Sequence, residues 1–385
     1  MDLPQFLFSL IVIYGSARLF GELAARLGQS AVLGELLAGV LVGGSVLGWV
    51  EPTETLKLMG EIGVILLLFE IGLESDLKAF LEVGWSATAV ATIGVVMPFA
   101  LGYGLAVVLN MTPLQAVFIG ATLTATSIAV SARTLDDLGR LKSMEGNIIL
   151  GAAVLDDLLG LVILAAIMKL AADGSVSWSQ AGLTAAGAVL FLGLAITIGV
   201  RYAHWFSRLV NQMRTRGSLI VAAITFALAL GYAGTLAHIA PLVGAFAAGL
   251  VLARAEHQIH LGEHIKPVAD VFVPIFFVLT GAAVDLGRLN PFSEQNWPVL
   301  LLTGGLTVAA ILGKLLAGLG AREVRVNRWA IGAGMLPRGE VGLIFAGVGL
   351  TSAVISTAEY GAILTVVALT TLLSPLLLKW FFKAA

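Results

Sequence analysis

Two adjacent carboxylates, Asp156 and Asp157, lie inside an apolar stretch that covers residues 148–167. A charged side chain at bilayer depth costs about 3 kcal/mol or more, and two neighbouring carboxylates also repel each other when both are ionised. We therefore expect a cation to meet this pair, whether a proton, a metal ion or a lysine.

The candidate lysine is Lys314, which stands alone among lysines in lying deep within an apolar stretch. Successive residues on a helix project about 100° apart, so the two aspartates cannot both face one neighbour. We expect Lys314 to pair with Asp156, because a buried lysine needs a counter-ion or must lose its proton. Asp157 then faces a cavity as the open carboxylate. The alternative is a purely structural pair in a protein that transports nothing.

The composition indicates what surrounds these residues. The chain is 58% hydrophobic and only 12% charged, with a mean hydropathy of +0.98. Soluble domains contain about 25% charged residues, so this is a polytopic membrane protein. Apolar runs of about 20 residues indicate helices rather than the short alternating strands of a barrel. The net charge of −2 gives no indication of nucleic-acid binding, and the absence of cysteine excludes disulfides and thiolate sites. No cofactor is expected.

The apolar runs predict an all-α fold of thirteen transmembrane helices. No connecting segment is long enough to fold alone, so we expect one membrane domain over residues 1–385 without a soluble regulatory domain. The N-terminus lacks the basic region of a cleaved signal peptide, which favours a retained first helix. The predicted spans are 4–27, 30–47, 55–75, 83–109, 113–134, 144–170, 179–203, 217–237, 240–256, 267–285, 297–320, 328–350 and 358–381.

The lysines and arginines indicate the orientation of these spans. Nearly all of those outside the spans fall after odd-numbered spans or at the C-terminus, which predicts a cytoplasmic C-terminus and an outside N-terminus. The opposite side holds only Lys57, Lys169 and Arg288. A miscounted span would destroy this asymmetry, so it supports the number of spans as well. For a bacterial protein, the expected location is the inner membrane.

The sequence also contains a weak internal repeat. Residues 32–39 resemble residues 242–249, and residues 72–77 resemble residues 281–286, at nearly equal offsets. We therefore expect spans one to six (about 4–170) to recur as spans eight to thirteen (about 217–381). With one linker helix (about 179–203) between them, the halves have opposite orientations, as in inverted-repeat transporters.

The fifth and twelfth spans correspond in this repeat, and both are predicted to be discontinuous. Thr122, Thr124, Thr126 and Ser127 follow one another in the fifth, either as ion ligands or with their hydroxyls bonded to their own helix. The twelfth contains a Pro-Arg-Gly-Glu sequence at 337–340, in which the proline cannot donate a backbone hydrogen bond. We expect its charges, Arg338 and Glu340, to neutralise each other across the break.

Several further acids and histidines remain to be placed. Glu35 and Glu61 are candidate cavity-lining acids, and Glu70 is a deeply placed acid without an obvious partner. His257 and His264 bound a loop rich in histidine and glutamate, which is either a pH sensor or, as we favour, an ordinary hydrated loop.

Taken together, Thr126-Ser127, Asp156-Asp157, Lys314 and the stretch 337–340 resemble the sodium/proton antiporters of the second monovalent cation:proton antiporter family. The bacterial two-aspartate members with thirteen helices are most similar. The resemblance implies a homodimer, with a dimerisation domain and a core domain that holds two crossed, broken helices. It also implies that Asp157 is the principal carrier of cation and proton, that Thr126 and Ser127 lie near the site, and that Asp156 pairs with Lys314.

These observations predict an antiporter that exchanges protons for sodium or lithium at Asp157 and Asp156 by alternating access, with a net movement of charge. Potassium/proton exchange stays open, because carboxylate and hydroxyl oxygens suit both ions. A cation channel is a further alternative, but it favours a continuous polar pore, whereas these acids converge at one depth. No feature favours an enzyme.

Overall fold

The computed structural model describes residues 2–75, 78, 82–173, 218–237, 239–253, 258–284, 297–323 and 325–383, with isolated positions between 182 and 201. Within these residues all regular structure is helical. The chain forms two compact units, of which unit 1 comprises Met1–Pro52, Val83–Ala181 and Phe277–Ala385, and unit 2 comprises Thr53–Glu82 and Gly182–Phe276.

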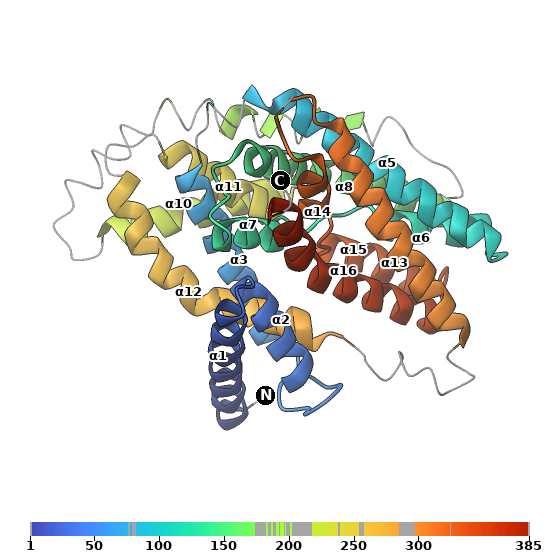
Figure 1. The fold of residues 1–385 in the computed structure, drawn as a ribbon, viewed down its shortest axis with the longest axis horizontal. Coiled ribbons are helices and arrows are strands. Elements are labelled where there is room, and N and C mark those ends of the chain that lie inside the picture. Colours follow the sequence, from blue (N-terminus) through green and yellow to red (C-terminus); the bar gives the residue numbers. More distant parts are fainter. Residues whose placement is uncertain are drawn as a thin grey trace. The chain divides into compact units, whose positions relative to one another are not determined.

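Unit 1 contains the helices that carry the residues of chemical interest. Within it, α5 and α13 lie along each other, and α13 also packs beside α16 (Figure 1). Its helices are α1 (Leu3–Arg26), α2 (Ala31–Val42), α5 (Gly84–Val108), α6 (Pro113–Thr122), α7 (Ile128–Asp137), α8 (Met144–Asp173), α13 (Trp297–Ala317), the short 3-10 helix η3 (Gly318–Gly320), α14 (Arg328–Gly334), α15 (Glu340–Thr351) and α16 (Thr357–Lys383).

Unit 2 contains α3 (Glu54–Glu74), α10 (Ser218–Leu236), α11 (Pro241–Leu252) and most of α12 (Gln258–Ala282), whose last turns belong to unit 1. Of all these helices, α1, α5, α8, α10, α12, α13 and α16 contain segments long and apolar enough to cross a membrane. Twelve of the thirteen predicted spans contain a described helix, and the seventh, 179–203, falls largely outside the described residues.

Two helix boundaries differ from the prediction by five residues or more. α2 ends at Val42 rather than at 47, because Gly43 leaves the helical conformation and a turn with Gly48 at φ +64° follows. α12 begins at Gln258, well before the predicted residue 267. His264 therefore lies on a helix and not in a loop, which corrects that prediction, whereas His257 lies outside the described residues. The polar first turns of α12 lowered the local hydropathy without ending the helix.

Glycines allow four of these helices to approach closely. In unit 1, a methyl group at Gly39 of α2 would collide with the carbonyl oxygen of Val278 in α12. In unit 2, a methyl group at Gly249 of α11 would collide with the carbonyl oxygen of Phe69 in α3. Only a residue without a side chain brings two helix backbones this near, which is a common way for membrane helices to associate.

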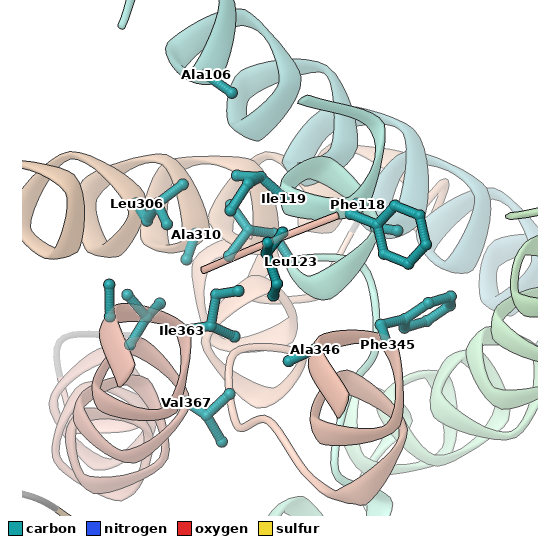
Figure 2. Packing of buried hydrophobic residues seen from close by; sticks show 14 of the residues in the cluster. Ala106, Phe118, Ile119, Leu123, Leu306, Ala310, Phe345, Ala346, Ile363 and Val367 are labelled. Atoms are coloured by element: carbon teal, nitrogen blue, oxygen red, sulfur yellow. The ribbon is translucent and has the colours of Figure 1, made fainter. Parts of the chain in front are cut away.

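A hydrophobic core in unit 1 joins residues of α5, α6, α8, α13, α15 and α16 (Figure 2). Phe118 and Leu123 project from α6 and its end, Leu306 from α13, Phe345 from α15 and Ile363 from α16. Close packing of such large side chains fixes the neighbouring backbone. The core therefore holds the end of α6 and the beginning of α15 in place, and these are the segments that border the candidate site.

Candidate functional site

The fifth and twelfth predicted spans are both interrupted, as the sequence indicated. α6 ends at Thr122 and α7 begins at Ile128, while α14 ends at Gly334 and α15 begins at Glu340. The intervening stretches, 123–127 and 335–339, are not helical, so their backbone groups must find partners outside their own helices.

The two interruptions supply hydrogen-bond partners to each other. The backbone N–H of Ser127 donates to the carbonyl oxygen of Pro337 at 2.8 Å, and Ser131 Oγ donates to the carbonyl oxygen of Gly334 at 2.6 Å. A methyl group at Gly339 would lie 3.1 Å from Ser127 Cβ, so a larger residue there would push the two stretches apart. The glycine and proline of the twelfth span thus permit both the break and the close approach.

The threonines of the fifth span divide into two groups. Thr122 and Thr124 donate their hydroxyl protons to carbonyl oxygens of their own helix, Ile119 and Ala121, at 2.7 and 2.8 Å. Thr126 instead reaches across to the other interruption and donates to the carbonyl oxygen of Met335 at 3.1 Å. Back-bonding is therefore the correct interpretation for the first two threonines, whereas Thr126 contacts the second interruption.

Lys314 of α13 is fully buried beside these stretches. Its ammonium nitrogen lies 3.3 Å from Asp156 Oδ2 on α8, as expected from the sequence. It also donates to Thr126 Oγ1 at 2.6 Å and to the carbonyl oxygen of Thr124. All three N–H groups of the ammonium thus have acceptors, two of which come from the interruption after α6.

The two aspartates of α8 are both buried, with 1% of Asp156 and 5% of Asp157 exposed. Asp156 uses Oδ2 for Lys314, while its Oδ1 has no hydrogen-bond partner among the described residues. A buried carboxylate oxygen without a donor is costly, so this atom provides an acceptor for a proton or a cation. Asp157 contributes to the electrostatic environment of Lys314.

Arg338 has backbone partners that the sequence did not reveal. Its guanidinium is fully buried and donates through Nη1 to the carbonyl oxygens of Leu123 and, at 3.4 Å, Ala125. Arg338 therefore covers the carboxyl end of α6, where the helix dipole places partial negative charge. The side chain of Glu340 lies outside the described residues, so the expected pairing of the two charges stays a prediction.

Three hydroxyl groups that the sequence interpretation missed hold the second interruption. Besides Ser131, the hydroxyl of Ser374 donates to the carbonyl oxygen of Ala333 at 3.0 Å. Thr371 Oγ1 lies 3.1 Å from the backbone nitrogen of Arg338 and 2.9 Å from its carbonyl oxygen. For the two hydroxyl groups on α16, the sequence could have indicated this role, because Thr370, Thr371 and Ser374 are polar residues in the apolar middle of that helix.

The remaining predicted acids lie on α2 and α3. Glu35 is buried on α2 in unit 1, whereas Glu61 is exposed on α3 in unit 2. Glu70, also on α3, is 4% exposed, and its Oε1 lies 3.7 Å from the ammonium nitrogen of Lys266 on α12. The partner of Glu70 that the sequence did not reveal is thus a half-exposed lysine of the same unit.

The sequence is similar to a known protein family and to named transporters. The family model described as "Sodium/hydrogen exchanger, transmembrane" matches residues 10–384. The chain is 41% identical over 417 residues to the high-affinity Na(+)/H(+) antiporter NhaS3 of Synechocystis, covering 98% of this chain and 90% of that protein. It is 38% identical over 385 residues to the Na(+)/H(+)-K(+) antiporter GerN of Bacillus cereus, covering 99% and 97% respectively.

The fold has a solved counterpart. The sodium proton antiporter MjNhaP1 from Methanocaldococcus jannaschii superposes with a TM-score of 0.73 at 19% identity, over 99% of this chain and 96% of that one. This likeness shows a shared fold, and the family model covers nearly the whole sequence. The chain therefore belongs to the family of transmembrane sodium/hydrogen exchangers.

Proposed function

We propose that this protein exchanges sodium or lithium ions for protons across the membrane by alternating access. The observation that carries the proposal is the pair of buried carboxylates on α8 beside two interrupted helices. A buried lysine of α13 forms an ion pair with one of these carboxylates. Interrupted helices at bilayer depth expose oxygen ligands, which is how many transporters build ion sites. Family membership and the similarity to named Na(+)/H(+) antiporters support the same activity.

Asp157 is the proposed carrier of both cation and proton. When it is ionised, it binds a partly dehydrated sodium ion together with Asp156 and with oxygen atoms of the interruption at Ser127. When it is protonated, the sodium ion leaves. Because the two ligands compete for one carboxylate, each side of the membrane exchanges one for the other without any long-range signal.

The charges in the site support a net movement of charge. Asp156, Asp157, Lys314 and Arg338 are all buried, and together they are neutral when every group is ionised. A sodium ion adds one positive charge to this set, and buried uncompensated charge is costly. Release of the lysine proton restores neutrality. When the sodium ion leaves, Asp157 and Lys314 each take up one proton, so two protons would move for each sodium ion.

The proposed architecture includes two inverted repeats of six helices around a linker helix, with the interrupted fifth and twelfth spans crossing each other. The glycine contacts support the repeat, because Gly249 and Gly39 differ by 210 positions and their contact residues, Val278 and Phe69, differ by 209. The contacts between residues 126–131 and 334–337 support the crossing.

The proposed assembly is a homodimer in the bacterial inner membrane, with the N-terminus outside and the C-terminus in the cytoplasm. The distribution of lysine and arginine supports the orientation, and the resemblance to dimeric antiporters supports the dimer. The orientation is tested by labelling single cysteines introduced at Asn110 and Gly139 with a membrane-impermeant maleimide. Because the sequence contains no cysteine, only the introduced residue can react. In intact cells, we expect labelling at position 110 and none at position 139.

The activity is tested in proteoliposomes by following the lumenal pH after sodium, lithium or potassium is added outside. We expect alkalinisation of the lumen with sodium and lithium, because cation entry drives proton exit. A response to potassium alone would replace the proposal by potassium/proton exchange; the similar protein GerN is named a Na(+)/H(+)-K(+) antiporter. The absence of a response to all three cations would contradict antiport altogether.

A further inference from the structure

Thr126 occupies a position from which it contacts both interruptions and the buried lysine. Its hydroxyl oxygen lies 2.6 Å from Lys314 Nζ, which is shorter than the 3.3 Å between Lys314 Nζ and Asp156 Oδ2. The same hydroxyl lies 3.1 Å from the carbonyl oxygen of Met335 and also hydrogen-bonds the side chain of Asp156. Its single proton therefore has two acceptors to choose from, and a lone pair of its oxygen accepts from the ammonium.

This geometry is a poor one for a sodium ligand. The oxygen already accepts a hydrogen bond from a full positive charge, and a second cation on the same oxygen would lie within a few ångströms of that charge. Ser127, the next residue, differs from Thr126 because none of the described contacts joins its hydroxyl to Lys314. The two neighbours that the sequence placed together near the ion therefore have different surroundings.

We propose that Thr126 is a positioning residue for Lys314 and not a ligand of the transported cation. The inference rests on the proposed sodium/proton exchange. In this arrangement, Asp156 turns from the lysine to the arriving cation, while Thr126 and the carbonyl oxygen of Thr124 keep the ammonium in place. Thr126 thereby governs how readily Lys314 releases its proton, since both acceptors favour the charged form of the amine.

The groups that face Lys314 from the surrounding helices are few. α8 contributes Asp156 and Asp157, and Arg338 lies after α14. α5 contains no aspartate, glutamate, lysine, arginine or histidine, and Gly94 is a point of close approach to Lys314 Nζ. α16 carries its charges, Glu359, Lys379 and Lys383, only near its ends. A change at Thr126 therefore acts on a small and identified set of charges.

The test is the pH profile of exchange at a fixed sodium concentration that saturates the wild type. Thr126→Val removes the hydroxyl at nearly constant volume. If Thr126 holds the ammonium, the lysine of the variant releases its proton more readily, and the half-maximal pH moves about one to two units toward acid. If Thr126 is a sodium ligand, sodium competes less well with protons and the profile moves toward alkaline pH. An alkaline shift or an unchanged profile would overturn the proposal.

Two control variants separate this effect from a general loss of structure. Thr126→Ser keeps a hydroxyl group and should restore the wild-type profile. Thr122→Val removes a buried hydroxyl that bonds only to its own helix, and it should leave the profile unchanged. If Thr126→Val does not purify as a folded protein, Thr126→Ala takes its place in every measurement.

A double-mutant cycle with Lys314→Gln tests the role of Thr126 by sodium binding instead of transport. Sodium binding to the purified protein is measured by calorimetry in detergent. In the Lys314→Gln background, Thr126→Val should leave the sodium dissociation constant unchanged, because there is no lysine to position. A tenfold or greater weakening in that background would identify Thr126 as a ligand and contradict the proposal. A wild type that exchanges no cation at all would contradict the proposed function instead.

Discussion

The ammonium of Lys314 lies closer to the hydroxyl of Thr126, at 2.6 Å, than to the carboxylate of Asp156, at 3.3 Å. The lysine is thus held by the interruption after α6 as well as by its ion-pair partner on α8. If Asp156 leaves the pair, the ammonium loses its counter-ion but keeps two of its three hydrogen-bond acceptors, the hydroxyl of Thr126 and the carbonyl oxygen of Thr124. This relationship supports the proposal that Asp156 serves both the pair with Lys314 and the bound cation.

Asp156→Asn should lower the stability of the protein. The change leaves a buried ammonium without a counter-ion, and breaking a buried pair in this way costs about 3 kcal/mol or more. Thermal unfolding of the detergent-purified protein measures the effect as a lower melting temperature. The double variant Asp156→Asn with Lys314→Met removes both charges and should recover most of the loss. An equally low melting temperature for both variants would contradict the importance of the pair.

Lys314→Gln should separate exchange from charge movement. If the lysine carries the second proton, the variant exchanges one proton for each sodium ion, and the transient current on a solid-supported membrane disappears. Exchange followed by a lumenal pH dye persists in the same preparation. A current of wild-type size in Lys314→Gln would remove the lysine from the coupling mechanism.

Gly39→Ala should disrupt the contact between α2 and α12. The added methyl group would collide with the carbonyl oxygen of Val278, and forced repacking of this kind costs about 1–3 kcal/mol. The matched control is Gly15→Ala on α1, where nothing lies within 4 Å of an added methyl group. The control should be neutral or more stable, since alanine favours helices over glycine. Equal melting temperatures for the two variants would contradict the close packing.

The sequence was sufficient to predict the elements of the site that depend on local chemistry. Pro337 and Gly339 indicated one interruption, and the run of threonine and serine before Ile128 indicated the other. A single lysine in an apolar helix and two adjacent aspartates left few possible pairs, so the proximity of Lys314 to Asp156 was foreseeable.

Contacts that involve backbone groups of distant residues could not be predicted from the sequence. Arg338 donates to the carbonyl oxygen of Leu123, and a carbonyl group has no signature in the sequence. The separate roles of Thr124 and Thr126 depend on where the helix ends, which the hydropathy pattern does not fix to one residue. The early start of α12 was missed because the prediction followed apolarity, and a helix can continue through polar residues into water.

The apparent affinity for sodium should fall as the pH is lowered, because protons and sodium compete for the same carboxylate. Below the pKa of the carrier carboxylate, each unit of acidification lowers its ionised fraction about tenfold. The sodium concentration for half-maximal exchange should therefore rise about tenfold per pH unit on the acid side and become constant on the alkaline side. Sodium titrations in proteoliposomes over a series of pH values measure this relation. A half-maximal concentration independent of pH would contradict a shared binding site.

The central claim is that Asp157 carries both the cation and the proton, and Asp157→Asn tests it most directly. The asparagine keeps the size of the side chain but neither ionises nor takes up a proton in this pH range. We expect a folded protein that produces no sodium-driven change of lumenal pH in proteoliposomes and shows no sodium binding by calorimetry, while Thr122→Val retains both. Sodium-driven proton movement at the wild-type rate in Asp157→Asn would contradict the account.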